Sequence, residues 1–249
     1  MSYRTLTVET KGALAFLRLA RPDRGNPVDA LFLQELDDVC ASINDDAAVR
    51  CAVLTAEGDI FSSGWDEAAP PTGRVTPPFV ALEEMGQPVV CALNGDAISA
   101  GLELALACDL RIAAEGARFA LPETAQAVMP SAGGTQRLPR LVGRSEALRL
   151  ILLGEEIDTA EALRIGLISA AVPGERLAAE AEALAQRIAD RGPIAVRYAK
   201  EAVRRGLDQP LDQALRYETD LTVILQTTAD RAEGVRAFIE KRPPKFEGR

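Results

Sequence analysis

The most informative absence in this chain of 249 residues is histidine, which does not occur at all. Serine–histidine and cysteine–histidine catalysis is therefore excluded, and so is every metal site built on imidazole ligands. Any proton transfer must rely on glutamate, aspartate, lysine, tyrosine or cysteine side chains. We expect no metal centre.

The cysteines and the apolar runs exclude further classes. The cysteines occur singly within apolar stretches, a pattern typical of small buried residues in a reducing compartment rather than of disulfides or a zinc site. No apolar run approaches the ~18 residues of a membrane span, and the N-terminus lacks the basic start and apolar core of a signal peptide. We expect a cytoplasmic protein with no membrane contact. The cysteines are Cys40, Cys51, Cys91 and Cys108.

Positive charge is also scarce. The chain has 28 Lys and Arg against 37 Asp and Glu, and its net charge of −9 disfavours nucleic acid or an anionic membrane as a partner. An anionic substrate would need a local basic patch. The length is enough for one domain, or for one domain with an appendage.

Hydrophobic periodicity predicts an alternation of strands and helices in the first two thirds of the chain. Asp29 is expected to cap an amphipathic helix, and short apolar runs between turns are expected to form strands. This alternation favours an α/β core. The proline-rich stretch 67–78 is predicted to be a surface segment. The predicted strands are 6–8, 13–19, 49–56, 89–93 and 110–113, and a further helix is predicted at 100–107.

Beyond Pro173 the pattern becomes entirely helical. The predicted helices are 175–190, 194–205, 211–226 and 231–240. The apolar face formed by Leu211, Leu215 and 221–225 must be buried against something. An oligomer interface is the most economical explanation.

Two glutamates stand where a solvated charge is not expected. Glu103 lies in the small, apolar run 94–109, which predicts a buried helix. Glu123 follows Pro122 after the strand-like run Ala117–Leu121. Carboxylates are rarely buried without compensation, and two near one cleft would raise at least one pKa, as acid–base chemistry requires. Alternatively, Glu103 is an ordinary acid at a helix N-terminus and Glu123 faces solvent.

Two glycine loops offer main-chain donors. The loop 60–66 carries Gly64 just before a residue whose N–H can point into a cleft. The loop 98–101 opens a helix whose first N–H groups have no partner within the helix. Two such donors that converge would form an oxyanion hole for a carbonyl that gains negative charge.

These features together make the chain resemble the crotonase superfamily, also called the enoyl-CoA hydratase/isomerase family. The resemblance runs in order along nearly the whole chain, and its most specific parts are the stretches 94–113 and 133–138. The motifs that carry it are Leu19-Ala20-Arg21-Pro22, Phe61-Ser62-Ser63-Gly64, Asn94-Gly95, Cys108–Ala113, Phe119–Glu123, Pro130–Leu138, Ala162–Leu167 and Ala237–Pro243.

The resemblance implies a fold and an assembly. The α/β core would be a spiral of ββα units over residues 1–190, and residues 191–249 would form a helical region that drives formation of trimers or hexamers. The partner would be an acyl-CoA thioester, with coenzyme A entering as part of the substrate and with no further cofactor.

The resemblance also implies roles for individual groups. The backbone N–H groups of Trp65 and Ala100 would form the oxyanion hole. Glu103 and Glu123 match the two carboxylates of the hydratase branch, which adds water syn to a trans-2-enoyl-CoA to give a 3-hydroxyacyl-CoA. Glu103 would act as base on the water, and Glu123 as the acid that supplies the Cα proton. A Δ3,Δ2-enoyl-CoA isomerase using Glu123 alone, and a non-catalytic acyl-CoA-binding trimer closed by Trp65, remain alternatives.

The chain departs from the family pattern around coenzyme A. Asp23 and Ala68 stand where lysines often bind its phosphates, so nearby cations are expected to compensate. Trp65 replaces a small residue, and its indole is large enough to narrow the acyl pocket. Ser131 stands where glycine is common. The residues expected to contact the substrate or coenzyme A are Arg24, Asn26, Ser63, Gly64, Asp66, Ser131 and Lys241.

Overall fold

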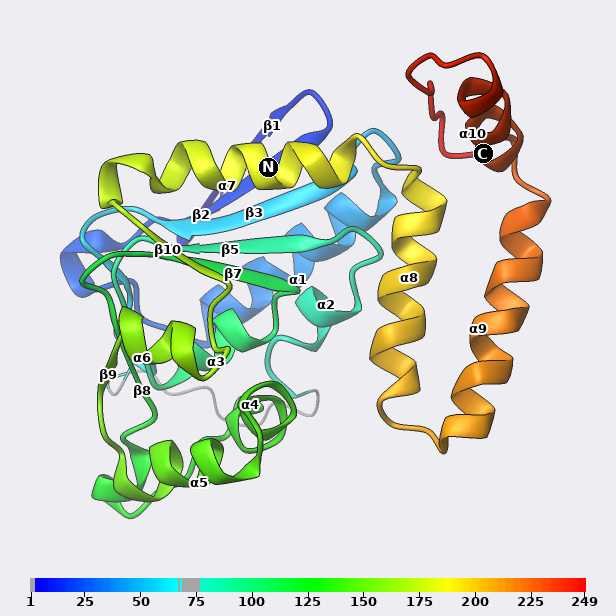
Figure 1. Ribbon diagram of the computed structural model, residues 1–249. Coiled ribbons are helices and arrows are strands. Elements are labelled where there is room, and N and C mark those ends of the chain that lie inside the picture. The colour runs from blue at the N-terminus through cyan, green and yellow to red at the C-terminus, as the bar shows by residue number, and fades with distance from the viewer. Residues whose placement is uncertain (1–2, 67, 69–76) are drawn as a thin grey trace.

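The computed structural model describes residues 3–66, 68 and 77–249, and its larger sheet forms the centre of the molecule (Figure 1). The strand order in this sheet is β1-β2-β3-β5-β7-β10. Strands β1 and β2 pair antiparallel, and the other neighbours pair in parallel. The strands are β1 (Leu6–Lys11), β2 (Leu14–Leu19), β3 (Cys51–Ala56), β5 (Val89–Leu93), β7 (Leu110–Ala114) and β10 (Ala170–Val172).

A smaller sheet has the order β4-β6-β8-β9, and β4, β6 and β8 are parallel neighbours. Each of these three follows a strand of the larger sheet: β3 leads to β4 and α2, β5 to β6 and α3, and β7 to β8. This repeat is the predicted spiral of ββα units. The new elements are β4 (Ile60–Ser62), β6 (Asp96–Ile98), β8 (Arg118–Ala120), β9 (Ile157–Asp158), α2 (Val80–Glu84) and α3 (Ala100–Leu106).

Helices cover both faces of the larger sheet. Helix α7 (Gly174–Ala189) lies across one face, and α1 (Ala30–Asp45) lies on the other (Figure 1). Side chains of a strand alternate between the two faces of the sheet. Val53 therefore packs in the cluster with α7, whereas Leu54 packs in the larger cluster with α1, which we call the inner core. Helix α1 begins as predicted, because the Asp29 carboxylate accepts a hydrogen bond from Phe32 N at 2.8 Å.

Several short elements were not predicted from the sequence. A strand of two or three residues, or a helix of one or two turns, is too short to show a clear period. Strand β3 also begins two residues later than expected, because Val49 N donates to Asp46 O in a turn. The remaining helices are α4 (Gly134–Val142), α5 (Arg144–Leu153), α6 (Thr159–Arg164), and the 3₁₀ helices η1 (Pro22–Arg24) and η2 (Glu123–Gln126).

Three helices at the C-terminal end stand beside the sheets: α8 (Pro193–Gly206), α9 (Leu211–Gln226) and α10 (Ala229–Ile239) (Figure 1). They match the predicted helices within two residues. The predicted boundary after residue 190 falls in the connection between α7 and α8, and the division into core and appendage stays a prediction. Apolar side chains exposed on these helices, or directly after α8, are Val203, Leu207, Leu211, Leu215, Val223, Ile224, Val235, Phe238 and Ile239.

Two further predictions concern burial. All four cysteines are buried and free, as expected. None of the helices that the structure describes is long and apolar enough to cross a bilayer. The proline-rich stretch 67–78 lies largely outside the described residues.

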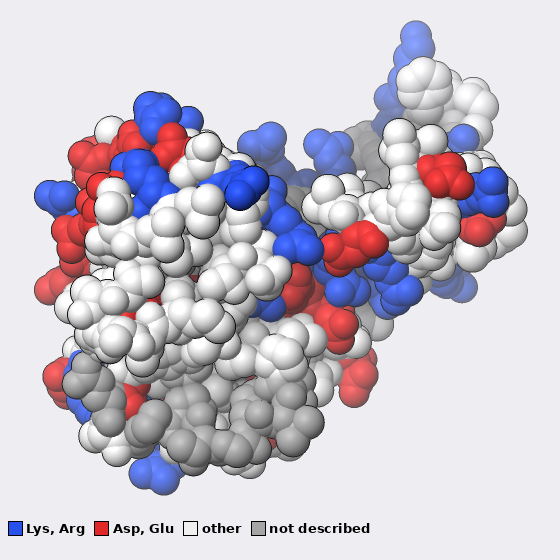
Figure 2. Space-filling view, turned by 90° about the horizontal axis from the view of Figure 1, so that it is seen from below, with Lys and Arg blue, Asp and Glu red and all other residues white. Residues whose placement is uncertain are grey.

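Seen from below, much of the surface over the sheets and their helices carries no charged side chain (Figure 2).

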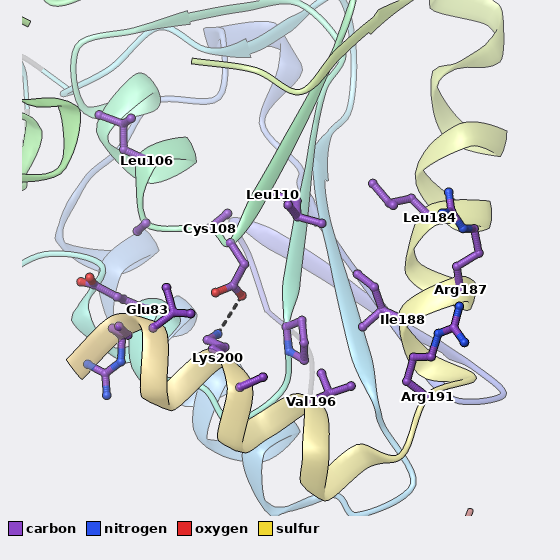
Figure 3. A pocket seen from close by; sticks show the side chains of 16 residues that line it. Glu83, Leu106, Cys108, Leu110, Leu184, Arg187, Ile188, Arg191, Val196 and Lys200 are labelled. Carbon is purple, nitrogen blue, oxygen red and sulfur yellow. Dashed lines mark hydrogen bonds and ion pairs between the residues drawn. The ribbon is translucent and has the colours of Figure 1, made fainter. Parts of the chain in front are cut away.

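Helix α8 has no fully buried residue, and a lysine holds it on the core. Lys200 Nζ lies 2.8 Å from Asp109 Oδ2 and 3.1 Å from Gln87 O, beside a cavity of about 640 Å³ between α7, α8 and β7 (Figure 3). The Lys200 side chain is only 11% exposed. Solvent therefore screens this pair less than it screens a surface ion pair.

We expect Lys200→Met to loosen α8 while the larger sheet stays folded, because Asp109 loses its cation. Hydrogen bonds to charged groups contribute ~1.5–3 kcal/mol, so hydrogen–deuterium exchange in α8 should accelerate by about tenfold or more. Arg176→Met is the matched control. Arg176 and its partner Glu180 are both exposed on α7, so their ion pair contributes little to stability. Unchanged exchange in α8 of the Lys200 variant would contradict this role.

Candidate active site

The smaller sheet gathers the groups predicted for the site. Segments that follow the carboxyl ends of neighbouring parallel strands meet at one edge of a sheet. Trp65, Ala100 and Glu123 follow the ends of β4, β6 and β8 by two or three residues. Glu103 lies in the first turn of α3, which begins at Ala100. The topology therefore brings four groups from distant parts of the sequence to one edge.

Glu103 is completely buried. Its Oε1 accepts hydrogen bonds from two backbone N–H groups, Ala132 N at 2.8 Å and Gly134 N at 2.7 Å. Its Oε2 is also buried, and it has no hydrogen-bond partner in the part of the chain that the structure describes. One oxygen thus orients the carboxyl group, and the other is available to a ligand.

Glu123 is 6% exposed and begins η2, directly after Pro122. Neither of its carboxylate oxygens has a hydrogen-bond partner within residues 3–66, 68 and 77–249. The helix η2 is tied to α5 by the Thr124 hydroxyl, which donates to Ile151 O at 2.9 Å. Buried polar atoms are nearly always hydrogen-bonded in native proteins, so these oxygens indicate a place for a water molecule or a substrate.

The surroundings tune Glu103 for proton transfer. Burial raises the pKa of Glu103 to about 7, although the two N–H donors oppose this shift. The nearby charge of Glu123 raises the pKa further, and the Arg137 guanidinium lowers it. A carboxyl group whose pKa lies near neutral pH can accept and return a proton efficiently.

The two glycine loops touch each other. Gly64 has φ of 99°, and a Cβ there would lie 2.6 Å from Ser99 Cβ and 2.9 Å from Ile98 O. A Cβ on Gly101 would lie 2.6 Å from Ser62 Cβ. No real Cβ tolerates such distances, so only glycine at both positions permits this approach. The loop between β6 and α3 is therefore packed tightly against the loop that follows β4.

These loops carry the two main-chain donors predicted from the sequence, the N–H groups of Trp65 and Ala100. Trp65 is held on both sides, because Val28 N donates to Gly64 O and Asp66 N donates to Val28 O. Ala100 is the first residue of α3, where an N–H has no partner within the helix. Neither the Trp65 N–H nor the Ala100 N–H donates to any residue that the structure describes. The Trp65 side chain is partly buried against the inner core.

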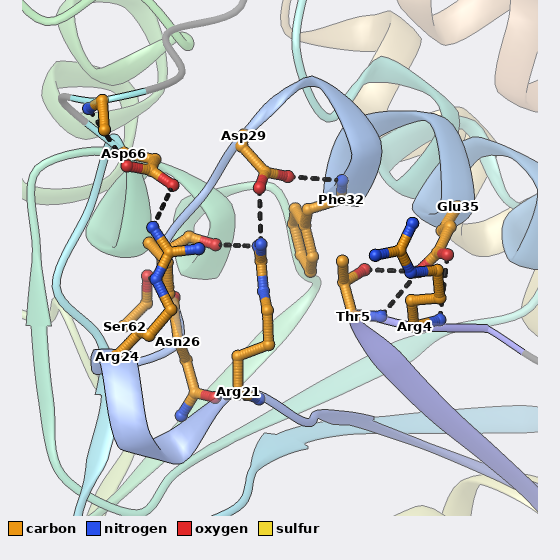
Figure 4. Close-up of polar contacts among 12 residues, drawn as sticks. Arg4, Thr5, Arg21, Arg24, Asn26, Asp29, Phe32, Glu35, Ser62 and Asp66 are labelled. Carbon is orange, nitrogen blue, oxygen red and sulfur yellow. Dashed lines mark hydrogen bonds and ion pairs between the residues drawn. The ribbon is translucent and has the colours of Figure 1, made fainter.

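Arg24 and Asp66 form an ion pair at the edge of this cradle (Figure 4). Arg24 Nη2 lies 2.6 Å from Asp66 Oδ2, and Asp66 Oδ1 also accepts from Ala68 N. The Arg24 side chain is 55% exposed, whereas Asp66 is buried. Arg24 therefore presents a positive charge to solvent beside the cradle, while Asp66 is turned toward the protein.

Asn26 has a supporting position under the cradle. Its side chain is buried, its Oδ1 accepts from Arg21 N at 2.9 Å, and its Nδ2 donates to Glu57 O and Ile60 O at 2.9 Å. Its carbonyl accepts from the Ser62 hydroxyl. Both polar atoms of this side chain, which was expected to contact the ligand, are thus hydrogen-bonded within the protein.

The other expected contacts lie in different surroundings. Ser63 and Ser131 are exposed, and Ser131 directly precedes the turn that binds Glu103. Lys241 is exposed just after α10, and Figure 1 shows α10 at the upper end of α9, well away from α3. One chain alone therefore does not bring Lys241 to Glu103.

The groups that orient Glu103 were not predicted from the sequence. The donors Ala132 N and Gly134 N are main-chain atoms, and only the glycine pair 133–134 before α4 signals an unusual turn there. Arg137, one turn into α4, hydrogen-bonds to the same turn. Its part in the site depends on contacts between distant residues, which no local pattern reveals.

Comparison with known proteins agrees with this geometry. The model of the enoyl-CoA hydratase/isomerase family matches residues 9–249. The chain is 38% identical over 257 residues to a crotonyl-CoA hydratase of Syntrophomonas wolfei, with 99% of each chain covered. It is 38% identical over 253 residues to an (E)-benzylidenesuccinyl-CoA hydratase of Thauera aromatica, covering 98% of this chain and 99% of that protein.

The fold agrees equally well with solved structures. A crystal structure of an enoyl-CoA hydratase from Bacillus anthracis superposes with a TM-score of 0.94 at 37% identity, covering 99% of this chain and 100% of the other. Both the sequence and the arrangement of the strands thus match along the full length. The chain belongs to the enoyl-CoA hydratase/isomerase family.

Proposed function

We propose that this protein is an enoyl-CoA hydratase, which adds water reversibly to a trans-2-enoyl-CoA thioester. The observation that carries the proposal is the set of three buried carboxylate oxygens, from Glu103 and Glu123, without a partner among the described residues. Leaving such a group unsatisfied costs ~1–3 kcal/mol or more, and one water held by both glutamates would satisfy one oxygen of each. Full-length relatives named as crotonyl-CoA and short-chain-enoyl-CoA hydratases support the same reaction.

The main-chain cradle would bind the thioester oxygen. When water adds to Cβ, negative charge moves onto this oxygen in an enolate-like state. The Trp65 and Ala100 N–H groups have no competing acceptor among the described residues, so both would be available to stabilise that charge. Donors of this kind favour the transition state over the ground state, which is the requirement for catalysis.

The two glutamates would divide the proton transfers. Glu103, with its pKa near 7, takes a proton from the water as the water oxygen bonds to Cβ. Glu123 gives a proton to Cα and is restored by exchange within the pair. Both carboxyl groups would act from the same side of the bound thioester, so water would be added syn. The reverse sequence dehydrates a 3-hydroxyacyl-CoA.

Coenzyme A would be bound by groups outside the glutamate pair. Arg24 uses one nitrogen for Asp66 and remains half exposed, so it has donors left for a phosphate. Lys241 would reach a phosphate only from another subunit of a trimer or hexamer. The exposed apolar side chains of α8, α9 and α10 support burial in such an assembly. Ser63, Gly64 and Ser131 would line the path of the thioester.

One observation favours the isomerase as a second candidate. Both oxygens of Glu123 lack a partner among the described residues, whereas one oxygen of Glu103 is bound to two N–H groups. Glu123 alone has the freedom to move a proton between two carbons of a 3-enoyl thioester. Such a reaction would not need Glu103 as a base.

The glutamate variants separate the two reactions. We expect Glu103→Gln and Glu123→Gln each to lower kcat for hydration of crotonyl-CoA by ~10²–10⁴, because general acid–base groups contribute factors of this size. The absorbance of the conjugated thioester measures the rate. Retained double-bond migration of a 3-enoyl thioester in Glu103→Gln, with no hydration by the wild type, would instead establish the isomerase.

The pH profile follows from the raised pKa of Glu103. Glu103 must be ionised to act as base, so kcat/KM should fall about tenfold per unit as pH drops below about 7. An unperturbed glutamate would place this limb near pH 4.3. Initial rates between pH 5 and 9 test this expectation, and a flat profile down to pH 5 would exclude Glu103 as the base.

The close approach of the glycine loops can be tested at Gly64. We expect Gly64→Ala to push the loop away from Ser99 and to lower kcat by ~10²–10³, the effect of losing an oxyanion donor. Gly116→Ala is the matched control: φ at Gly116 is also positive, at 90°, but no atom lies within 4 Å of the added Cβ. Equal losses of activity in the two variants would show that backbone strain, not the cradle, is responsible.

A further inference from the structure

The orientation of Glu103 depends on one short turn. Glu103 Oε1 is bound only by Ala132 N and Gly134 N among the residues described, and Oε2 has no partner there. The direction in which Oε2 points is therefore set by where the turn 131–134 places its two N–H groups. Whatever holds this turn controls the reactive oxygen.

Arg137 holds the turn from the side opposite Glu103. Its Nη1 donates to Ala132 O at 2.8 Å, so Ala132 is held by its N–H on the carboxylate and by its C=O on the guanidinium. Gly133 has φ of 108°, and a Cβ there would collide with Arg137 Nη1. The guanidinium thus lies directly against the main chain of the turn.

Arg137 is itself fixed by Glu83 on α2. Glu83 Oε2 accepts from Arg137 Nη2 at 2.6 Å and from Nε at 3.1 Å, so all three guanidinium nitrogens are used. The Arg137 side chain is only 14% exposed. Helix α2 is anchored in turn, because Phe79 and Leu82 are fully buried in the inner core. A rigid chain of contacts therefore runs from the core through Glu83 and Arg137 to the turn.

We propose that Arg137 is a positioning residue: held by Glu83, it fixes the turn 131–134 so that Glu103 Oε2 faces the water at Cβ. This inference rests on the proposed hydratase function for its effect on rate. The contacts themselves predict a change at Glu103 that does not depend on turnover.

The same arrangement acts on Glu103 electrostatically. The charged groups that act on Glu103 are Glu123 on η2, which raises its pKa, and Arg137 on α4, which lowers it. Removing the Arg137 cation while Glu123 stays in place leaves the Glu103 carboxylate less stabilised. The pKa of Glu103 must then rise.

Kinetics of Arg137→Gln give the first test. A displacement of a reacting group by about 1 Å costs about 10²-fold in rate, so kcat for crotonyl-CoA should fall by ~10–10²-fold with KM changed less than about threefold. The acid limb of the pH profile should move to higher pH. Arg137→Lys, which keeps the charge but not the planar fork, should lie between wild type and Gln. Arg140→Gln, on the exposed face of the same helix, should match wild type.

A titration independent of activity gives the second test. In protein labelled with ¹³C at the glutamate carboxyl carbon, the Glu103 signal is identified by its absence from Glu103→Gln. Its midpoint should rise by about half a pH unit or more in Arg137→Gln and stay unchanged in Arg140→Gln. If the wild type does not hydrate any enoyl thioester, the proposed function fails while this titration still decides the positioning role.

Glu83→Gln keeps the inference testable if Arg137→Gln does not fold. Glu83 is 33% exposed, and a glutamine there still offers an oxygen that can accept a hydrogen bond from Arg137, so this replacement is the milder one. It should lower kcat in the same direction as Arg137→Gln but less, and the double variant should be no worse than Arg137→Gln alone. A folded Arg137→Gln or Glu83→Gln protein with wild-type kcat and a wild-type Glu103 midpoint would overturn the proposal.

Discussion

Two carboxyl groups buried against one another are the constraint on which the site depends. Glu103 is fully buried and Glu123 nearly so, and between them they leave three oxygens without a partner in the described part of the chain. Such an arrangement is unfavourable for stability unless something occupies the space between the groups. It persists because two backbone N–H groups hold the Glu103 carboxylate in place, and burial gives Glu103 a pKa of about 7. The same feature that weakens the fold locally makes proton transfer possible at neutral pH.

The smaller sheet converts this constraint into a site. Three-residue strands cannot contribute much stability, yet β4, β6 and β8 place the ends of three ββα units side by side. Strain gathers there as well, since Ser99 has φ of 53° immediately before α3. The larger sheet, with its apolar faces covered by α1 and α7, supplies the rigid support. The larger sheet thus supplies the rigid support, and the smaller sheet carries the groups of the proposed site.

The sequence predicted the parts that depend on local pattern. Long apolar strands, the helix capped by Asp29 and the C-terminal helices all carry clear periodicity, and the structure confirms them. The burial of Glu103 was also predicted, because a charge within a small apolar run is anomalous. The meeting of the glycine loops was expected from family resemblance, since no spacing encodes a contact between Gly64 and Ser99. Asn26 was expected at the ligand, but its buried amide binds three backbone groups of the protein instead.

The central claim is that both glutamates share one water opposite a main-chain cradle for the thioester oxygen. A crystal structure of the protein with acetoacetyl-CoA, a stable analogue, tests it most directly. The account predicts that the thioester oxygen lies within about 3.2 Å of the Trp65 and Ala100 nitrogens. It also predicts that the carboxyl groups of Glu103 and Glu123 both lie within hydrogen-bond reach of one common position beside Cβ, where the water would be held. A thioester oxygen bound elsewhere, or carboxyl groups turned away from a common cavity, would contradict it.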